Sequence, residues 1–428
     1  MNLQIKIAEK INPHLFYGWI MLAVGFLGLL ATGPGQSYNI AVFVNPLIEE
    51  LNLSRTAISS AYSLGTMIAA LGLSYIGRMI DRFGPRLMIV VLALCLGAVC
   101  MLFPFVSGII ALSVAFTAVR FFGQGALTLG STNLVSQWFS RRRGMALSIT
   151  SLGFAVGNAF YPPLTQMLIA RIGWQMCWVL QGVFVLALII PIAGILVVNK
   201  PEDMELLPDG DPKPSPGEEN QASDVNGLED GFTVSEALRT VTFWVLAVGT
   251  AIPAMLITGM IFHQISYFEE QGLDAQSAAN IFPILSVSMV IFMVIYGQLL
   301  DRFKTSTVVS AGILMNAVAL WLLHIADTML LAGLYAVAMG ATQAAAMTNA
   351  SYIWPRFFGR KHLSGIQGTA FTVCIVGASL GPLPFGIAYD VFGGYHEAVL
   401  WLSLLPLIFG VAVYLSRPPT RAAGQTDA

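Results

Sequence analysis

The sequence predicts an all-α membrane protein with twelve transmembrane helices, arranged as two pseudo-symmetric six-helix bundles. Three observations predict this fold class: an apolar composition, a regular series of long apolar runs, and a charged motif that occurs twice. Hydrophobic residues make up 56% of the 428 residues, charged residues only 10%, and the mean hydropathy is +0.74. Soluble domains carry about 25% charged residues. A soluble chain of this composition could not cover its apolar surface, so we expect the lipid bilayer as its partner.

The apolar runs give the helices in order, because a bilayer core requires about 20 apolar residues for each helix. We expect six spans before a polar stretch and six after it: 17–45, 55–79, 87–106, 109–137, 145–170 and 174–198, then 241–268, 276–299, 306–325, 328–356, 363–390 and 395–415. This order predicts a first bundle at 1–198, a linker at 199–239 and a second bundle at 240–428.

The predicted linker is acidic and rich in Pro, Gly and Ser. Between Lys200 and Glu236 it holds eleven of the chain's 23 acidic residues. Such a segment cannot bury a core, so we expect a flexible tether, with a regulatory docking site as the alternative.

Basic residues predict the orientation of the chain in the membrane. Eleven Lys and Arg occupy loops on one side: Arg78, Arg82, Arg86, Arg141, Arg142, Arg143, Arg302, Lys304, Arg356, Arg360 and Lys361. The opposite loops carry only Arg55 and Arg171. By the positive-inside rule, both termini and the linker are cytoplasmic. The expected location is the plasma membrane, a bacterial inner membrane. The apolar run after Tyr17 has no cleavage site, so we read it as the first membrane helix rather than a signal peptide.

The repeated motif supports the division into two similar bundles. Gly-x-x-x-Asp-Arg-Phe occurs at Gly77–Phe83 and again at Gly297–Phe303, each time between two spans. A second pair, Phe139-Ser140-Arg141-Arg142 and Phe358-Gly359-Arg360-Lys361, has nearly the same offset. Internal repeats of this kind are typical of secondary transporters.

The motif itself has a physical logic. Gly77 permits close helix approach, and Gly84-Pro85 turns the chain sharply. An acidic side chain such as Asp81 at this rim can bind the free N–H groups at the start of a neighbouring helix. The alternative is a charged cluster that only fixes orientation.

The motif between the second and third spans resembles the signature of the major facilitator superfamily, and the resemblance extends over the whole chain. Trp138–Ala146 and Trp354–Arg360 are most similar to the bacterial monocarboxylate-transporter-like and oxalate/formate-antiporter-like branch. The resemblance implies the major facilitator fold and a cytoplasmic gate that is closed in the outward-open state and breaks as the halves rock. It places Asp81 against Leu363–Ile366 and Asp301 against Gly144–Ser148. The residues expected in this gate are Gly77, Asp81, Arg82, Gly84, Arg142, Asp301 and Arg302.

Arg120 is the only Lys or Arg deep inside a span. A cation at that depth is costly, so it should face the bundle interior with a partner or a substrate. A structural role and a role in substrate or proton coupling are equally open. Carboxylate transporters of this branch commonly add a cation in the eighth or eleventh helix, but 278–297 and 363–389 contain no Lys or Arg.

Other polar residues at mid-depth suit a small hydrogen-bonding solute, although any of them could simply bridge helices. With Arg120, the expected substrate cavity comprises Gln124, Gln36, Tyr38, Asn39, Asn158, Tyr161, His263, Gln343, Asn349 and Gln367. His263 is either a proton site or a histidine satisfied near the outer interface. Gly33-Pro34-Gly35 should weaken the first helix beside Gln36.

The function predicted from these features is secondary active or facilitative transport of a small organic solute, with a carboxylate as the leading substrate. Efflux of a neutral or amphiphilic compound is the alternative, and a transporter-like membrane sensor is a more distant one. We expect no enzyme, because no cluster of His, Asp or Glu has catalytic or metal-ligand spacing. The four Cys lie inside apolar spans, so no metal or cofactor is expected. The expected partners are the solute and a coupling proton, not nucleic acid, and the chain should function as a monomer.

Overall fold

The computed structural model describes residues 5, 8, 15–211, 231–359, 362–417 and 419. Arg360, Lys361 and residues 212–230 of the predicted linker lie outside this described part. Within it the chain is helical and contains no strand, which confirms the all-α fold class. Ten of the described helical stretches are long and apolar enough to cross a membrane.

The count of twelve spans stays a prediction, because two of the expected spans lie within one continuous helix. Helix α8 (Arg143–Leu196) is 54 residues long, but Gly173 inside it has φ 80° and ψ 161°. Glycine adopts positive φ without a steric cost, so the chain reverses there between the spans expected at 145–170 and 174–198. The first expected span is divided into the shorter helices α2 (Gly18–Ala31) and α3 (Ser37–Leu51) by the 3₁₀ turn η1 (Gly33–Gly35).

The chain forms two compact units, and the boundary between them crosses two helices. Unit 1 comprises residues 1–219 and 261–286, and unit 2 comprises residues 220–260 and 287–428. Helices α10 (Val241–Glu270) and α12 (Ile281–Arg302) therefore each contribute one end to unit 1 and the other to unit 2.

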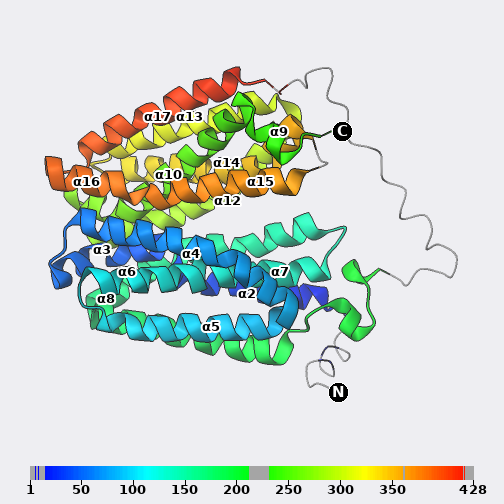
Figure 1. The fold of residues 1–428 in the computed structure, drawn as a ribbon. Coiled ribbons are helices and arrows are strands. Elements are labelled where there is room, and N and C mark those ends of the chain that lie inside the picture. The colour runs from blue at the N-terminus through cyan, green and yellow to red at the C-terminus, as the bar shows by residue number, and fades with distance from the viewer. Residues whose placement is uncertain are drawn as a thin grey trace. The chain divides into compact units, whose positions relative to one another are not determined.

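Unit 1 is a bundle in which α2 packs against α8 and α7, while α5 packs against α8 (Figure 1). Its remaining helices are α4 (Arg55–Phe83), α5 (Pro85–Leu102), α6 (Gly108–Val119), α7 (Thr128–Trp138) and the short α11 (Ala275–Ala279). A π-helical stretch, Arg120–Leu127, joins α6 to α7. The core of this unit contains stacked aromatic rings. The centroid of the Trp178 ring lies 4.0 Å from that of Phe103 and 4.6 Å from that of Phe43.

Unit 2 is organised around α13, which contacts both α14 and α17. Its elements are α9 (Val234–Leu238), α13 (Thr305–His324), α14 (Met329–Phe358), α15 (Leu363–Leu380), α16 (Pro382–Phe392) and α17 (His396–Leu415). The Ser310 hydroxyl donates to the Gly410 carbonyl at 2.6 Å and ties α13 to α17. Buried Phe243, Trp354 and Phe358 form an aromatic group in its core.

Close helix approach in unit 1 depends on Gly153. A Cβ added at this position of α8 would overlap the Phe26 carbonyl of α2, whereas a Cβ at Gly194 of the same helix meets nothing within 4 Å. We predict that Gly153→Ala destabilises the protein by about 1–3 kcal/mol, because the two backbones must separate. Gly194→Ala, the matched control, should leave the thermal unfolding temperature in detergent unchanged or higher. Equal unfolding temperatures for the two variants would contradict this account.

Candidate functional site

Arg120 lies at the junction of α6 and the π-helical stretch and is only 4% exposed. Its Nε donates to Thr66 Oγ1 at 3.0 Å, and its Nη1 donates to the Gly35 carbonyl and to Ser37 Oγ, both at 3.2 Å. The guanidinium carbon lies 4.8 Å from the centre of the Tyr62 ring, which adds a cation–π contact. All of these partners are neutral, and no acidic side chain of the described residues pairs with Arg120.

The backbone around Arg120 explains how its side chain reaches this position. A Cβ at Gly35 would overlap the Val119 carbonyl and lie 2.9 Å from Gly123 Cα. The 3₁₀ turn η1 therefore lies directly against the π-helical stretch, which brings the Gly35 carbonyl within reach of the guanidinium. π-Helical segments occur frequently at functional sites. Irregular backbone at membrane depth is tolerated where it is buried in protein or lines a cavity.

Three predicted cavity residues of unit 1 carry buried polar atoms without a partner. Tyr38, Asn158 and Tyr161 are 2%, 1% and 5% exposed, respectively. The two tyrosine hydroxyls and both amide atoms of Asn158 find no hydrogen bond among the described residues. The two tyrosine ring centroids lie 6.4 Å apart, and the Tyr38 hydroxyl faces Gly157, next to Asn158. Buried polar atoms without a hydrogen bond are rare in proteins, so a bound solute or water is expected to satisfy these atoms of Tyr38, Asn158 and Tyr161.

Asn39 is as deeply buried, but both polar atoms of its side chain form hydrogen bonds with other residues of the bundle. Its Nδ2 donates to Gln181 Oε1 at 2.9 Å, and its Oδ1 accepts from Thr165 Oγ1 at 2.8 Å and from Gln181 Nε2 at 3.1 Å. This closed network joins α3 to both halves of α8, so we assign Asn39 to the internal structure of the bundle. Gln36 also has an internal partner, Thr32 Oγ1, at 3.0 Å, whereas the Gln124 side chain is exposed.

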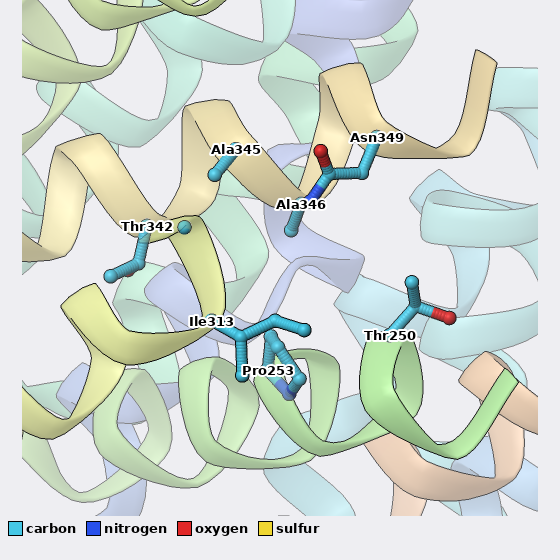
Figure 2. A pocket seen from close by; sticks show the side chains of 8 residues that line it. Thr250, Pro253, Ile313, Thr342, Ala345, Ala346 and Asn349 are labelled. Carbon is cyan, nitrogen blue, oxygen red and sulfur yellow. The ribbon is translucent and has the colours of Figure 1, made fainter. Parts of the chain in front are cut away.

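In unit 2, Gln343 and Asn349 of α14 are 5% and 3% exposed. Gln343 Nε2 and Asn349 Oδ1 have no partner among the described residues. Asn349 borders a cavity of about 10 Å³, which is also lined by Thr250 and Pro253 of α10 and Ile313 of α13 (Figure 2). This volume matches a single water molecule, which would satisfy the amide oxygen. Gln367 on α15 is half-buried and has its own contacts.

His263 belongs to a polar seam inside unit 1, where the end of α10 contacts α3 and α4. Its Nε2 lies 3.2 Å from Ser59 Oγ, and the neighbouring Phe262 ring lies 4.5 Å from the Tyr62 ring. Asn45 is the centre of this seam: its Oδ1 accepts from Ser266 Oγ at 2.6 Å and from Arg55 Nη1 at 3.0 Å. Its Nδ2 donates to Glu269 Oε2.

The same seam borders a pocket of about 460 Å³, a size typical of small-molecule sites. Its lining includes Glu49, Glu50, Glu269, Gln166 and Trp174. Sequence analysis missed Asn45 and Glu269, because both lie near helix ends where polar residues are unremarkable. Only the contacts between helices distant in sequence distinguish them.

The predicted gate residues lie at the helix ends with exposed charges. Asp81, Arg82, Arg142, Asp301 and Arg302 are exposed, and Gly77 and Gly84 are half-buried. Gly84 has φ 80°, as the predicted sharp turn requires, and a Cβ there would lie 2.8 Å from the Asn199 side chain. Asp301 interacts with Tyr352 inside unit 2. The backbone N–H of Arg142 donates to Asp209 at 3.1 Å, a partner that sequence analysis did not identify.

Comparisons with known proteins place this architecture among transporters. The family model of the Major Facilitator Superfamily matches residues 25–328 and 254–428. The oxalate:formate antiporter of Oxalobacter formigenes is 25% identical over 259 residues, which are 60% of this chain and 57% of that protein. MFS-type transporter 1 of Ophiocordyceps sp. (strain BCC 1869) is 23% identical over 434 residues, or 94% of this chain and 85% of that protein. This chain matches less than two thirds of the length of the Oxalobacter formigenes antiporter.

Solved structures show the same fold. A bacterial homologue of the human lysosomal transporter Spinster, inward-facing and unoccupied, matches with a TM-score of 0.71 and 15% identity over 93% of this chain and 96% of that chain. A mutant of the nucleoside transporter NupG matches with a TM-score of 0.72 and 12% identity over 94% and 100%. At these identities the likeness concerns the fold alone.

The two buried asparagines allow a direct test of which residues serve the fold. Asn39→Ala removes three hydrogen bonds and leaves the buried Gln181 Oε1 without its donor, although Gln181 Nε2 still donates to Thr165 Oγ1, so we expect a loss of about 1–3 kcal/mol in unfolding free energy. Asn158→Ala breaks no side-chain hydrogen bond among the described residues and should leave thermal stability nearly unchanged while reducing solute uptake. Thermal unfolding and uptake, measured on both variants, check this. A stable Asn39→Ala protein, or normal uptake by Asn158→Ala, would contradict the assignment.

Proposed function

The chain belongs to the Major Facilitator Superfamily and is a multi-pass membrane transporter of a small solute, and from this premise we propose that its solute is a small carboxylate bound at Arg120. The observation that carries the proposal is a buried guanidinium whose partners are all neutral. We propose secondary active or facilitative transport by alternating access between the two halves.

The energetics of Arg120 favour an anionic ligand. Taking a cation out of water costs several kcal/mol even after the protein relaxes, and neutral hydrogen bonds offset only part of this cost. A carboxylate supplies the missing negative charge and can accept two parallel N–H bonds from a guanidinium. Binding of the solute would therefore complete a site that the protein leaves electrically unbalanced.

The turn η1 connects Arg120 with the unsatisfied tyrosines. Its Gly35 carbonyl accepts from Arg120, and a Cβ at its Gly33 would overlap the Tyr161 ring. A 3₁₀ turn rises about 2 Å per residue, so these two contacts are separated by only a few ångströms along it. We place the carboxylate at Arg120 and the rest of the solute toward Tyr38, Asn158 and Tyr161.

The relative from Oxalobacter formigenes supports the same class of solute, since its name identifies oxalate and formate as the compounds it exchanges. Both are small carboxylates. Arg120 would serve as the anchor that the eighth and eleventh helices do not provide in this chain.

Efflux of a neutral or amphiphilic compound is the second candidate. The pocket with Glu49, Glu50 and Glu269 favours it, because three carboxylates around one cavity repel anions that approach from that side. The absence of Lys and Arg from 278–297 and 363–389 points the same way.

The remaining parts of the proposal concern the setting. We propose a plasma-membrane location with cytoplasmic termini, a monomer, and two six-helix halves joined by the linker at 199–239. A proton is the proposed coupling ion, with His263 as its candidate site. Asp81 and Asp301 are the proposed latch residues of the cytoplasmic gate.

Uptake into proteoliposomes tests the assignment of Arg120. We expect one or more small carboxylates in a panel to accumulate, and Arg120→Gln to lower kcat/KM by about a hundredfold or more, because the solute charge loses its partner. Arg171→Gln, the same change at an exposed arginine of α8 just before the break at Gly173, is the matched control and should retain activity. Running the panel with and without a pH gradient tests proton coupling. The carboxylate assignment fails if no member of the panel is carried and none raises the unfolding temperature.

A further inference from the structure

The first part of the predicted linker is bound to several helices of unit 1. We call residues 196–211 the strap. The Tyr17 hydroxyl, directly before α2, donates to the Leu196 carbonyl at 2.7 Å. Trp138 Nε1, at the end of α7, donates to the Val198 carbonyl at 3.1 Å. These two bonds hold the beginning of a segment whose composition predicts a free tether.

Asn199, the next strap residue, supplies the side-chain cap that α5 lacks. This helix begins after Gly84, which has no side chain to accept a hydrogen bond, and its first residue, Pro85, has no N–H. The first N–H of the helix is therefore that of Arg86, and it donates to Asn199 Oδ1 at 3.0 Å. A Cβ at Gly84 would lie only 2.8 Å from the Asn199 side chain. A larger residue at position 84 would thus displace the side chain that caps the helix.

The far end of the strap is a tight turn that presents a carboxylate. Asp209 and Gly210 both adopt positive φ, 63° and 72°, and the Asp211 N–H donates to the Pro208 carbonyl at 3.3 Å. Asp-Gly is a preferred pair where both central residues of a turn have positive φ. A Cβ at Gly210 would lie 2.9 Å from the Phe16 ring, so the turn also lies against the residues that precede α2.

The Asp209 carboxylate binds the turn that leads into α8. Its Oδ2 accepts from the backbone N–H groups of Ser140 at 3.0 Å and Arg141 at 2.7 Å, and its Oδ1 accepts from that of Arg142 at 3.1 Å. Two residues later, Asp211 Oδ1 lies 2.9 Å from Arg141 Nη2. Slight burial raises the pKa of Asp209, but the three backbone donors and the Arg141 charge outweigh it, so its pKa lies below the ordinary value. Asp209 is therefore charged at neutral pH and satisfies three backbone donors of this turn.

We propose that the strap is a built-in brace of unit 1, in which Asn199 and Asp209 position the two turns that carry Gly84 and Arg142. Neither of these turns provides its own cap, because the N-cap residues Gly84 of α5 and Arg142 of α8 form no side-chain cap hydrogen bond. One segment supplies the acceptors for both turns. Gly84 and Arg142 are residues of the predicted gate, and only this consequence for the gate rests on the proposed function.

The strap connects the two turns as a folded segment. Between Asn199 and Asp209, Met204 and Leu206 pack against the core of unit 1. Within the strap, the Leu206 N–H donates to the Pro201 carbonyl at 3.1 Å. A segment held at intervals of a few residues has little slack, so a shift of either turn must break contacts of the strap. Asn199 and Asp209 thus act on the gate residues through the backbone and touch no solute.

Hydrogen–deuterium exchange of the full chain in detergent, resolved to single amides by mass spectrometry, tests the brace without any solute. Asp209→Ala removes the acceptor of the Ser140, Arg141 and Arg142 N–H groups, so we expect these amides to exchange about tenfold faster or more. Asp209→Asn keeps an acceptor oxygen but loses the charge and should give an intermediate rate. Asp211→Ala is the matched control, because it removes only a surface ion pair and should change these rates less than about twofold.

The same measurement tests Asn199 at the turn of the repeated motif. Asn199→Ala removes the acceptor of the Arg86 N–H, and we expect this amide to exchange about tenfold faster or more. Asn199→Asp keeps a side-chain oxygen at the start of α5 and should retain the slow exchange. Lys200→Ala, a change at the exposed neighbouring side chain, is the matched control and should leave the rate at Arg86 within about twofold.

Amides in the middle of α5 serve as the internal reference and should exchange at the wild-type rate in every variant. Unchanged exchange at either turn in its alanine variant would overturn the brace. Faster exchange throughout the unit, with a lower unfolding temperature, would overturn it as well, because the residue would then serve general stability. A protein that passes these tests but carries no carboxylate keeps the brace and loses the substrate assignment. A carboxylate transporter whose turns do not respond keeps the substrate assignment and loses the brace.

Discussion

Every polar group inside a membrane span must find a partner within the protein, because the surrounding lipid offers none. The buried residues of unit 1 differ in how they meet this constraint. Asn39 satisfies it through Gln181 and Thr165 and thereby joins α3 to α8. Among the described residues, Asn158 has no partner for either amide atom, and Arg120 has hydrogen-bond partners but no acidic one. The incomplete groups around Arg120 are those that we propose a solute completes, so the requirement that stabilises the bundle also supports the proposed site.

Irregular backbone meets the same constraint in a second way. The turn η1 and the π-helical stretch lie against each other through Gly35 and Gly123, where any larger residue would force the backbones apart. Their contact gives Arg120 a carbonyl acceptor at membrane depth, which a regular helix would not expose. The helix break at η1, the π-helical stretch and the buried Arg120 therefore form one structural feature. The break and the stretch pack together, and Arg120 binds the carbonyl that this packing brings within reach.

The sequence predicted those features that depend on composition and spacing. Apolar runs indicated the spans, Gly33-Pro34-Gly35 indicated the break in the first helix, and Arg120 stood out as the only cation at depth. The sequence could not separate Asn39 from Asn158, because both are asparagines in apolar surroundings and only tertiary contacts distinguish them. It also could not identify Asp209 as bound, because an acidic, Pro-rich segment has the composition of a tether whether or not one of its carboxylates has a partner.

Charge at the two ends of unit 1 bears on the direction in which an anion would move. Arg141, Arg142 and Arg143 lie at the predicted cytoplasmic end, and Glu49, Glu50 and Glu269 line the pocket on the predicted outer side. A field of this sign concentrates anions at the arginine-rich end and depletes them at the Glu-lined end, which changes how often an anion meets either end. It does not change the equilibrium affinity of Arg120 for a given carboxylate in one conformation. In the proposed orientation, a free anion would therefore meet the arginine-rich end of unit 1 more often, whereas a carboxylate that carries its proton is neutral and would approach the Glu-lined pocket without this penalty. For the proposed carboxylate and the proposed orientation, the same charge pattern would thus link the choice between import and export to the protonation state of the solute.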